Sequence, residues 1–494
     1  MNSNDDFLCL ISKLINPYLF LFLLSICINN IKVNSYLIYP LEYLPDKNYK
    51  FIRDNNINEI SPEEAIQQLY FKNIITKIDM GNPIQKIPFL LETNKRHFYL
   101  ASSNPSIKSN EQGKNSEYYQ FTNNELYNEL LSSSYKNNTC EVVYHMTYGY
   151  SEICDSNDTL HFNINNTNVD QEFRFKLVKN NDGNISGSIG LLYHDSNYEF
   201  TRGFITELKR ANLTDNYYWF FNFDVFSPLE KKLKGQFILG GLPHEIFPKK
   251  YSEEDLITTS SAEVRLAGLA WRLNFNKIYI DNKEDKITVF ENQAMTFNYE
   301  IYNVISSMKF QFEIRDLIMD ELIAQNKCFC SNFSQNIYSS YNLTFYYCLK
   351  SAKDILYKKI PSIKFSSVEL SHIFELTKEE LFYEKGDYIY FMIFFGGITF
   401  NYFSLGQMFT TKFNFVFNTF YQEIGFYKTE NSKGIMEKKI KSNEIPYLYI
   451  VIVLIPFISL FVGFLIGKTV FGKRTKKQNA KELNEEKDSS INEV

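Results

Sequence analysis

The chain has 494 residues, of which 44% are hydrophobic and 22% are charged. This composition is ordinary for a folded protein and excludes a largely disordered chain. The formal net charge is −5, which gives no electrostatic basis for binding nucleic acid. At the usual domain size, the length predicts about two to four compact units.

The N-terminal region contains an apolar run, Tyr18–Ile28, that is too short to span a membrane comfortably. Such a run is typical of a signal peptide, and Val33 and Ser35 supply the small residues that a cleavage site needs. We therefore expect a signal peptide at 1–35. Because acidic residues precede the run, where positive charge is usual, an uncleaved signal anchor is the alternative.

A second apolar run, Ile445–Gly467, carries no charge and as a helix would cross about 30 Å of hydrocarbon. Lysines and an arginine follow it, which places the C-terminus in the cytoplasm by the positive-inside rule. We expect a single-pass type I membrane protein of the secretory pathway or cell surface. Its lumenal or extracellular body would begin at residue 36, followed by a stalk (431–444), a transmembrane helix (445–467) and a cytoplasmic tail (468–494).

The body contains short apolar runs separated by Asn, Asp, Gly and Ser, which predict a mainly β architecture. Helical periodicity is confined to Pro62–Leu69, Phe204–Arg210 and Tyr302–Met308. The polar stretch 104–138 predicts a surface insertion. Export would make the N-x-S/T sequons glycan acceptors, and these stand at Asn137, Asn157, Asn165, Asn184, Asn212, Asn332 and Asn342.

Five segments of the body resemble, in the correct order, the sequence patterns of pepsin-like aspartic proteases. In the first segment, Gly81, Pro83 and Gln85 match the family's I-x-I-G-T-P-x-Q, and Glu92 stands where the family has its first catalytic Asp. The other segments are Gly187–Tyr193, Gly235–Gly241, Trp271–Ile278, and the closing run Leu405–Phe409 with Val416–Asn418 and Ile424–Phe426.

The resemblance is to the membrane-anchored, apicomplexan plasmepsin-like branch of the family. It implies a mainly β, bilobal fold with a central cleft, in which 36–262 form the N-terminal lobe and 263–430 form the C-terminal lobe. It adds no cofactor and no metal. It implies a peptide or protein as the ligand of the cleft.

Aspartic proteolysis uses two carboxyl groups that share one proton, each on a tight Asp-Thr/Ser-Gly loop. The first triplet here is Glu92-Thr93-Asn94, which keeps the hydroxyl but lengthens the acid by one methylene and replaces the glycine. Asn tolerates the left-handed backbone region better than most residues, so the turn can persist. The first catalytic position is therefore degenerate.

The second triplet contains no Asp-Thr-Gly or Asp-Ser-Gly, and its register is open by one residue. If Phe290 stands at the Asp position, the second carboxyl group is lost. If Glu291 stands there, the triplet is Glu291-Asn292-Gln293, with neither hydroxyl nor glycine.

The resemblance also implies a flap hairpin over the cleft, and Tyr148-Gly149 fits its tip. Cys140 and Cys154 flank this hairpin, as paired cysteines do in nepenthesin-like and parasite membrane-anchored members. In the second lobe a disulfide would draw on Cys328, Cys330 and Cys348, with one thiol left over. No histidine or second cysteine pair completes a metal site around Cys328-x-Cys330.

These observations favour a membrane-anchored aspartic-protease-like protein that is catalytically inactive and binds peptides or proteins. One alternative is an active aspartic-type endopeptidase that uses Glu92 and Glu291, although misplaced groups cost orders of magnitude in rate. The other alternative is a structural or adhesive surface glycoprotein whose insertion 104–138 and glycans form the working surface.

Overall fold

The structure of the protein is a computed structural model. It describes residues 35–43, 73–103, 126–145, 149–164, 167–179, 187–192, 203–227, 232–261, 270–281, 286–334, 342–396 and 403–428. All of them belong to one compact unit, Met1–Glu437, whereas the second unit, Lys438–Val494, lies wholly outside the described residues. Residues 1–34, the lobe boundary at 262/263, the stalk, the run 445–467 and the tail also lie outside them. Across the described ranges, no helix combines the length and the apolar character needed to cross a membrane.

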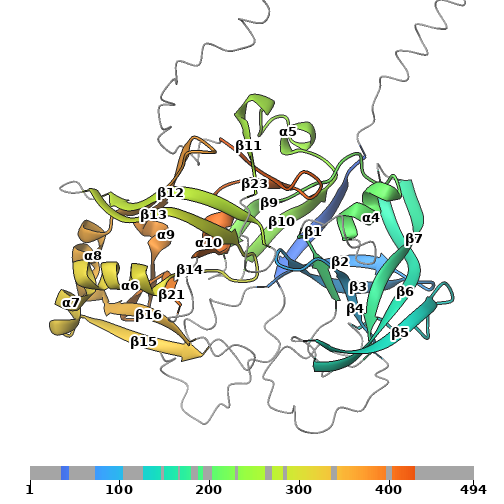
Figure 1. The fold of residues 1–494 in the computed structure, drawn as a ribbon, viewed down its shortest axis with the longest axis horizontal. Coiled ribbons are helices and arrows are strands. Elements are labelled where there is room, and N and C mark those ends of the chain that lie inside the picture. The colour runs from blue at the N-terminus through green and yellow to red at the C-terminus, as the bar shows by residue number, and fades with distance from the viewer. Residues whose placement is uncertain are drawn as a thin grey trace, which may run out of the picture. The chain divides into compact units, whose positions relative to one another are not determined.

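The described strands form two sheets, which confirms the mainly β prediction (Figure 1). The first sheet runs, in spatial order, β11 (Leu256–Ser260), β24 (Glu423–Tyr427), β23 (Phe415–Asn418), β9 (Tyr218–Ser227), β10 (Lys232–Leu239), β1 (Leu37–Tyr43), β2 (Ile74–Met80), β3 (Gln85–Glu92), β8 (Gly187–Gly190), β4 (Phe98–Ala101), β7 (Thr167–Val178), β6 (Gly149–Ile164) and β5 (Lys136–His145). N-terminal and C-terminal segments therefore share this sheet.

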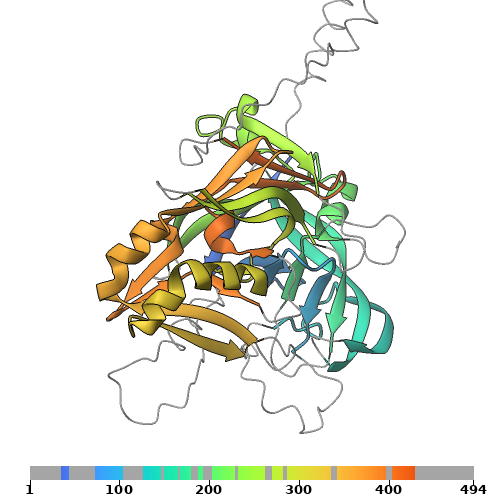
Figure 2. The same ribbon diagram turned by 60° about the vertical axis from the view of Figure 1, so that its left-hand side comes forward.

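The second sheet is built from the C-terminal part of the body. Its order is β18 (His372–Thr377), β17 (Ser362–Ser367), β12 (Arg272–Asp281), β13 (Lys286–Phe297), β22 (Phe403–Leu405), β14 (Val304–Ser306), β21 (Ile393–Phe395), β16 (Asn342–Leu349), β20 (Tyr388–Phe391) and β19 (Phe382–Lys385), and β15 (Cys328–Ser334) pairs with β16. Figure 2 brings its helices α6, α7 and α8 forward, beside these strands.

The described helices are short. They are α4 (Phe204–Arg210), α5 (Pro243–Ile246), η3 (Glu253–Asp255), α6 (Met308–Ile314), η4 (Arg315–Met319), α7 (Asp320–Ala324), η5 (Lys350–Ala352), α8 (Lys353–Lys359), α9 (Lys378–Leu381) and α10 (Gln407–Thr410). The helix predicted at Phe204–Arg210 is confirmed. The one predicted at Tyr302–Met308 is wrong, because Val304–Ser306 pairs with β21 and β22 as a buried strand, and α6 begins only at Met308.

The predicted surface insertion 104–138 is corrected over its second part. Tyr127 is fully buried, and its hydroxyl donates to Asp158 of β6. Tyr127 also forms a bridge with Ser102, directly after β4. The chain at 126–128 is therefore part of the core of the first sheet, while 104–125 lie outside the described residues.

Both tryptophans of the chain are buried where the two sheets meet. Trp219 on β9 stacks on Phe417 of β23 with ring centroids 4.3 Å apart, and it meets Trp271 edge-on at 6.2 Å. The Trp271 indole Nε1 donates to the carbonyl oxygen of Leu191 at 2.9 Å. Since Leu191 directly follows β8 and Trp271 directly precedes β12, this bond joins the two sheets next to the loops described below.

Three strands of the first sheet form a compact motif. Strand β3 runs parallel to β8, and β4 runs antiparallel to the same strand, so that Leu90 and Tyr99 both pair with Ser188. The chain between β3 and β4 therefore forms a loop that crosses the end of β8. Glu92 begins this loop and lies opposite Gly190.

The second sheet repeats this motif with β13, β22 and β14. Here Thr296 and Ile305 both pair with Ser404, one in parallel and the other in antiparallel register. The two sets of pairings put the two loops in one-to-one correspondence. Asn298 holds the place in the second loop that Glu92 holds in the first.

One glycine in each motif lets the loop pass close to the central strand. A Cβ on Gly190 would lie 2.6 Å from the backbone nitrogen of His97, and one on Gly406 would lie 2.0 Å from the carbonyl oxygen of Asn303. His97 and Asn303 occupy equivalent places in the two loops. The same close backbone approach is thus built twice, and only glycine allows it.

We expect Gly406→Ala to destabilise the fold by about 2 kcal/mol or more, because its methyl group must displace backbone rather than a flexible side chain. Urea unfolding of the full-length chain measures this loss. Gly203→Ala is the matched control, since the nearest heavy atom to its Cβ is an ordinary 3.5 Å away. Equal stabilities of the two variants would contradict the close approach.

Candidate functional site

Glu92 lies at the end of β3 and is half-buried. The buried Ser188 of β8 donates its hydroxyl hydrogen to Glu92 Oε2. The next residue, Thr93, is fully buried, and its Oγ1 donates to the carbonyl oxygen of Phe297 at 3.3 Å. This bond joins the first loop to the last residue of β13, directly before the second loop.

The second loop is Asn298-Tyr299-Glu300. The Asn298 backbone N–H donates to the carbonyl of Leu405 at 3.0 Å, and the Glu300 N–H donates to Asn298 Oδ1 at 2.9 Å. The Asn298 side chain therefore holds the turn. Tyr299 is buried, and it packs edge-on against Phe221 with ring centroids 4.7 Å apart.

Glu300 is the second carboxyl group of the site. It is half-buried, and its Oε1 is shielded from solvent without a hydrogen-bond partner. The side chain of Asn94 forms a hydrogen bond with the Glu300 carboxyl group. Asn94 and Glu300 hold equivalent positions in the two loops, so each loop contributes one of the two side chains of this hydrogen bond.

The two carboxyl groups are close enough for their charges to interact. Burial, followed by repulsion from Glu92, raises the pKa of Glu300 to about 8, against the opposing effects of Lys95 and Asn94. Burial also raises the pKa of Glu92, against the opposing effects of Lys95 and Ser188. Both shifts favour the protonated forms of the two acids, because nearby buried negative charges are costly.

This arrangement offers a ligand two neighbouring carboxyl groups, each of which donates a hydrogen bond when protonated and accepts one when ionised, and the charge of Lys95 acts on both. It differs from a symmetric catalytic pair in one respect. The two equivalent loop positions hold a carboxylate, Glu92, and an amide, Asn298, and an amide does not exchange protons near neutral pH. The second acid, Glu300, comes two residues later in its loop.

The structure places the predicted first triplet, Glu92 to Asn94, at this site. The predicted second triplet is wrong in register. Phe290 and Glu291 lie inside β13, where their backbones pair with Ile278 and Lys277 of β12, and Asn292 follows them in the same strand. The strand continues to Phe297 before the loop begins, so the residues beside Glu92 are Asn298–Glu300.

Sequence reasoning missed Glu300 because nothing in its local sequence marks it. It follows no family triplet, and its role comes from the interaction with Glu92 across the two motifs. The place of the second loop is set by the pairing of Phe297 with Leu405, which is far away in the sequence, so no local signal marks it.

The predicted flap region is a described hairpin of β5 and β6. Its strands pair from Lys136–Asn157 to His145–Gly149, so Gly149 begins β6 directly after the turn. Tyr148 lies outside the described residues together with the rest of the turn at 146–148.

Two disulfides are present, one in each sheet. Cys140 bonds to Cys154 across β5 and β6, as the resemblance implied, and Cys328 bonds to Cys348 across β15 and β16. Cys330 is the thiol left over in the second sheet. Glu152 lies beside the first disulfide, but both sulfur atoms there are oxidised and cannot bind a metal as thiolates.

Comparison of the sequence with models of known protein families and with curated proteins gave no match.

We expect Glu300→Gln to change how stability depends on pH. An acid whose pKa is raised in the folded state binds its proton more tightly there, so its favourable contribution is lost as pH rises from about 4.5 to about 8. The wild-type chain should lose stability over this range relative to Glu300→Gln, as measured by urea unfolding at pH 5, 6.5 and 8.5.

Glu172→Gln is the control for this series. Hydrogen bonds from Asn157 and Lys136 lower the pKa of Glu172, so its favourable contribution is present above the unfolded pKa and is lost only as the solution becomes more acidic than that. A wild-type profile that stays parallel to that of Glu300→Gln from pH 5 to 8.5 would show that Glu300 is an ordinary exposed acid.

Proposed function

We propose that this chain is a pepsin-like, catalytically inactive protein that binds a peptide at the Glu92–Glu300 pair. The observation that carries the proposal is the correspondence of the two loops, in which one position has an acid, Glu92, and the other has an amide, Asn298. Aspartic proteolysis uses carboxyl groups at both positions to hold and activate water. Replacing one of them by an amide removes this chemistry and keeps hydrogen-bonding groups for a ligand.

The pepsin-like assignment is supported by features of the sequence and of the described fold. The five matching segments occur in the family's order, and two of them, at Gly190 and Gly406, form the repeated motif of the two sheets. A disulfide-linked hairpin stands where the resemblance implies a flap. The bond from Thr93 to Phe297 joins the two loops, as a two-loop site requires.

We also propose that the body lies in an oxidising compartment and is anchored by 445–467. The two disulfides support this, because disulfides persist mainly in secreted and lumenal proteins. Three of the sequon residues have exposed side chains, which a glycan requires, namely Asn137, Asn212 and Asn332.

A second candidate function is peptidase activity by the Glu92–Glu300 pair in place of the predicted Glu92–Glu291 pair. The observation that favours it is the electrostatic interaction of the two acids, which together with burial raises the pKa of Glu300 to about 8, since a protonated acid near a second carboxyl group can in principle activate water. Against it stands the asymmetry of the two loops, because a displacement of about 1 Å in a reacting group can cost about 100-fold in rate.

The test exposes the purified full-length chain to a mixed-sequence peptide library from pH 3.5 to 7.5 and records both cleaved and retained peptides. We expect retention without cleavage. Glu92→Gln should lower the affinity for a retained peptide by about 10- to 100-fold, because it removes a charged hydrogen bond. Glu254→Gln, on the exposed turn η3, should leave its affinity unchanged.

The outcomes separate the two candidates. Cleavage that disappears in both Glu92→Gln and Glu300→Gln would establish the peptidase and overturn our proposal. Retention that is the same in the wild type and in Glu92→Gln would show that peptides do not bind at this pair.

A further inference from the structure

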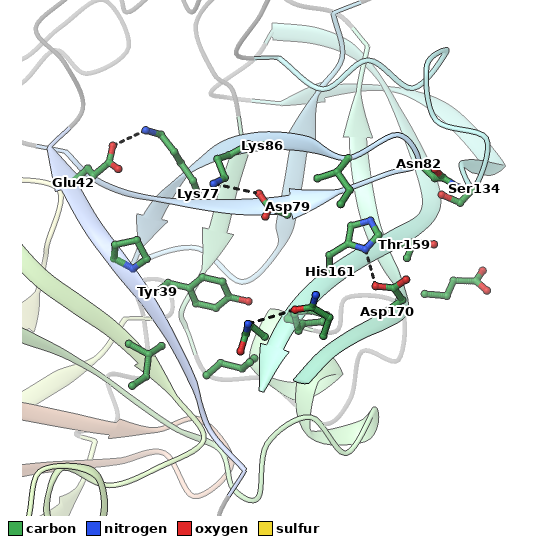
Figure 3. Close-up of a pocket in the computed structure, with 18 residues that line it drawn as sticks. Tyr39, Glu42, Lys77, Asp79, Asn82, Lys86, Ser134, Thr159, His161 and Asp170 are labelled. Atoms are coloured by element: carbon green, nitrogen blue, oxygen red, sulfur yellow. Dashed lines mark hydrogen bonds and ion pairs between the residues drawn. The ribbon is translucent and has the colours of Figure 1, made fainter. Parts of the chain in front are cut away.

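A pocket of about 890 Å³ lies on the first sheet, lined by residues of β1, β2, β3, β6 and β7 and by nearby turns (Figure 3). Neither Glu92 nor Glu300 lines it, so it is separate from the site described above. No sequence motif pointed to it. Strand β1 pairs with β10 over Leu37–Leu41 and with β2 only at Glu42 and Tyr43, whereas the end of β2 pairs with β6 at Asp79 and Met80.

Two polar atoms in this pocket have no hydrogen-bond partner. The hydroxyl oxygen of Tyr39 and the Oδ1 of Asp79 are both shielded from solvent and make no hydrogen bond, although Asp79 Oδ1 has a long ion pair with Lys86. Lys86 Nζ approaches Asp79 Oδ1 only to 3.8 Å, beyond hydrogen-bond distance, and its side chain is largely exposed. Figure 3 shows the Tyr39 ring extending from β1 among the side chains of the pocket, with Asp79 above it on β2. Burial and then the charge of Asp79 raise the pKa of Tyr39, so the hydroxyl stays protonated.

The other charged groups of the pocket already have partners. Lys77 Nζ lies 2.7 Å from Glu42 Oε2. His161 Nδ1 lies 2.7 Å from Asp170 Oδ1, and its Nε2 lies 2.9 Å from the carbonyl oxygen of Gly81.

Glu172, on the same rim, accepts from Lys136 at 3.1 Å and from Asn157 at 3.0 Å. Asp79 is therefore the carboxylate of the described lining that has an oxygen shielded from solvent and no hydrogen bond to it, since its ion pair with Lys86 is long at 3.8 Å. A buried acceptor left unpaired is costly, and a ligand that supplies the donor gains this free energy on binding.

The walls around these atoms are partly apolar. Leu37 and Phe162 are buried in the lining, and Pro40 and Ile84 complete it on the outer side. Such walls suit a short hydrocarbon stem that ends in a hydrogen-bond donor. An anionic ligand would be repelled by Asp79, and a neutral alcohol would bring a hydrogen-bond donor without the positive charge that complements the carboxylate.

We propose that this pocket binds a primary alkylammonium group, of the kind that a lysine side chain presents. An ammonium has three N–H donors, which can reach both Asp79 Oδ1 and the Tyr39 oxygen, and its charge complements the carboxylate. Its methylene stem would lie along Leu37 and Phe162. The pocket would thus recognise a lysine of a partner protein or a free alkylamine, independently of what binds at Glu92 and Glu300.

The test uses isothermal titration calorimetry of the full-length chain with Nα-acetyl-lysine methylamide. We expect measurable binding that falls at least 10-fold when the ligand's Nε is acetylated, because acetylation removes the charge and two of the three donors. The norleucine analogue, which keeps the four-carbon stem without the amine, should bind at least as weakly. Titration with n-butylamine separates the two sources, since affinity equal to that of the lysine derivative indicates a free amine and weaker affinity indicates a lysine side chain.

Two variants locate the contact. Asp79→Asn should lower the affinity at least 10-fold, and Tyr39→Phe, which removes only the hydroxyl, should lower it about 3- to 10-fold. Asp155→Asn is the matched control. Asp155 lies on β6, which contributes other residues to the pocket, but it pairs with Lys176 at 2.7 Å and does not line the pocket itself. Thermal melts confirm that each variant is folded. Equal binding of the acetylated and unacetylated ligands, or unchanged affinity in both Asp79→Asn and Tyr39→Phe, would overturn the proposal.

Discussion

The bond between Thr93 and the carbonyl of Phe297 is the contact on which the site depends, because it holds the ends of two strands from different sheets together. It does not act alone. Trp271 donates a hydrogen bond to the carbonyl oxygen of Leu191 nearby, and Trp219 stacks on Phe417 where the two sheets meet. These contacts fix the backbone on both sides, so two acidic side chains remain close despite their mutual repulsion.

The motif that is repeated in the two sheets explains how a few backbone contacts position the two loops of the site. In each sheet, one strand end meets a glycine of a central strand, and the following loop crosses that glycine at backbone contact distance. The same geometry therefore gives equivalent positions for Glu92 and Asn298. The different residues at these positions, rather than a different backbone, give the site its asymmetry.

The sequence predicted those parts of the structure that are encoded locally. Short apolar runs separated by Asn, Asp, Gly and Ser predicted the strands. The spacing from Gln85 to Glu92 located the first loop, because the glycine turn, the strand and the loop are contiguous there. The disulfide of the first sheet followed from the resemblance alone. The second loop could not be located in this way, because no triplet remains and its register is set by pairing with the distant Leu405. Glu300, Tyr39 and Asp79 escaped prediction for the same reason, since each acquires its role from a residue far away in the sequence.

The most direct test of the account is a carbon-13 NMR titration of the glutamate carboxyl groups in the full-length chain. We predict that one glutamate titrates near pH 8, that its signal disappears in Glu300→Gln, and that its pKa falls in Glu92→Gln while staying above 4.5, because burial remains when the repulsion is removed. The account would be contradicted if every glutamate titrated below pH 6, or if replacing Glu92 left the high pKa unchanged.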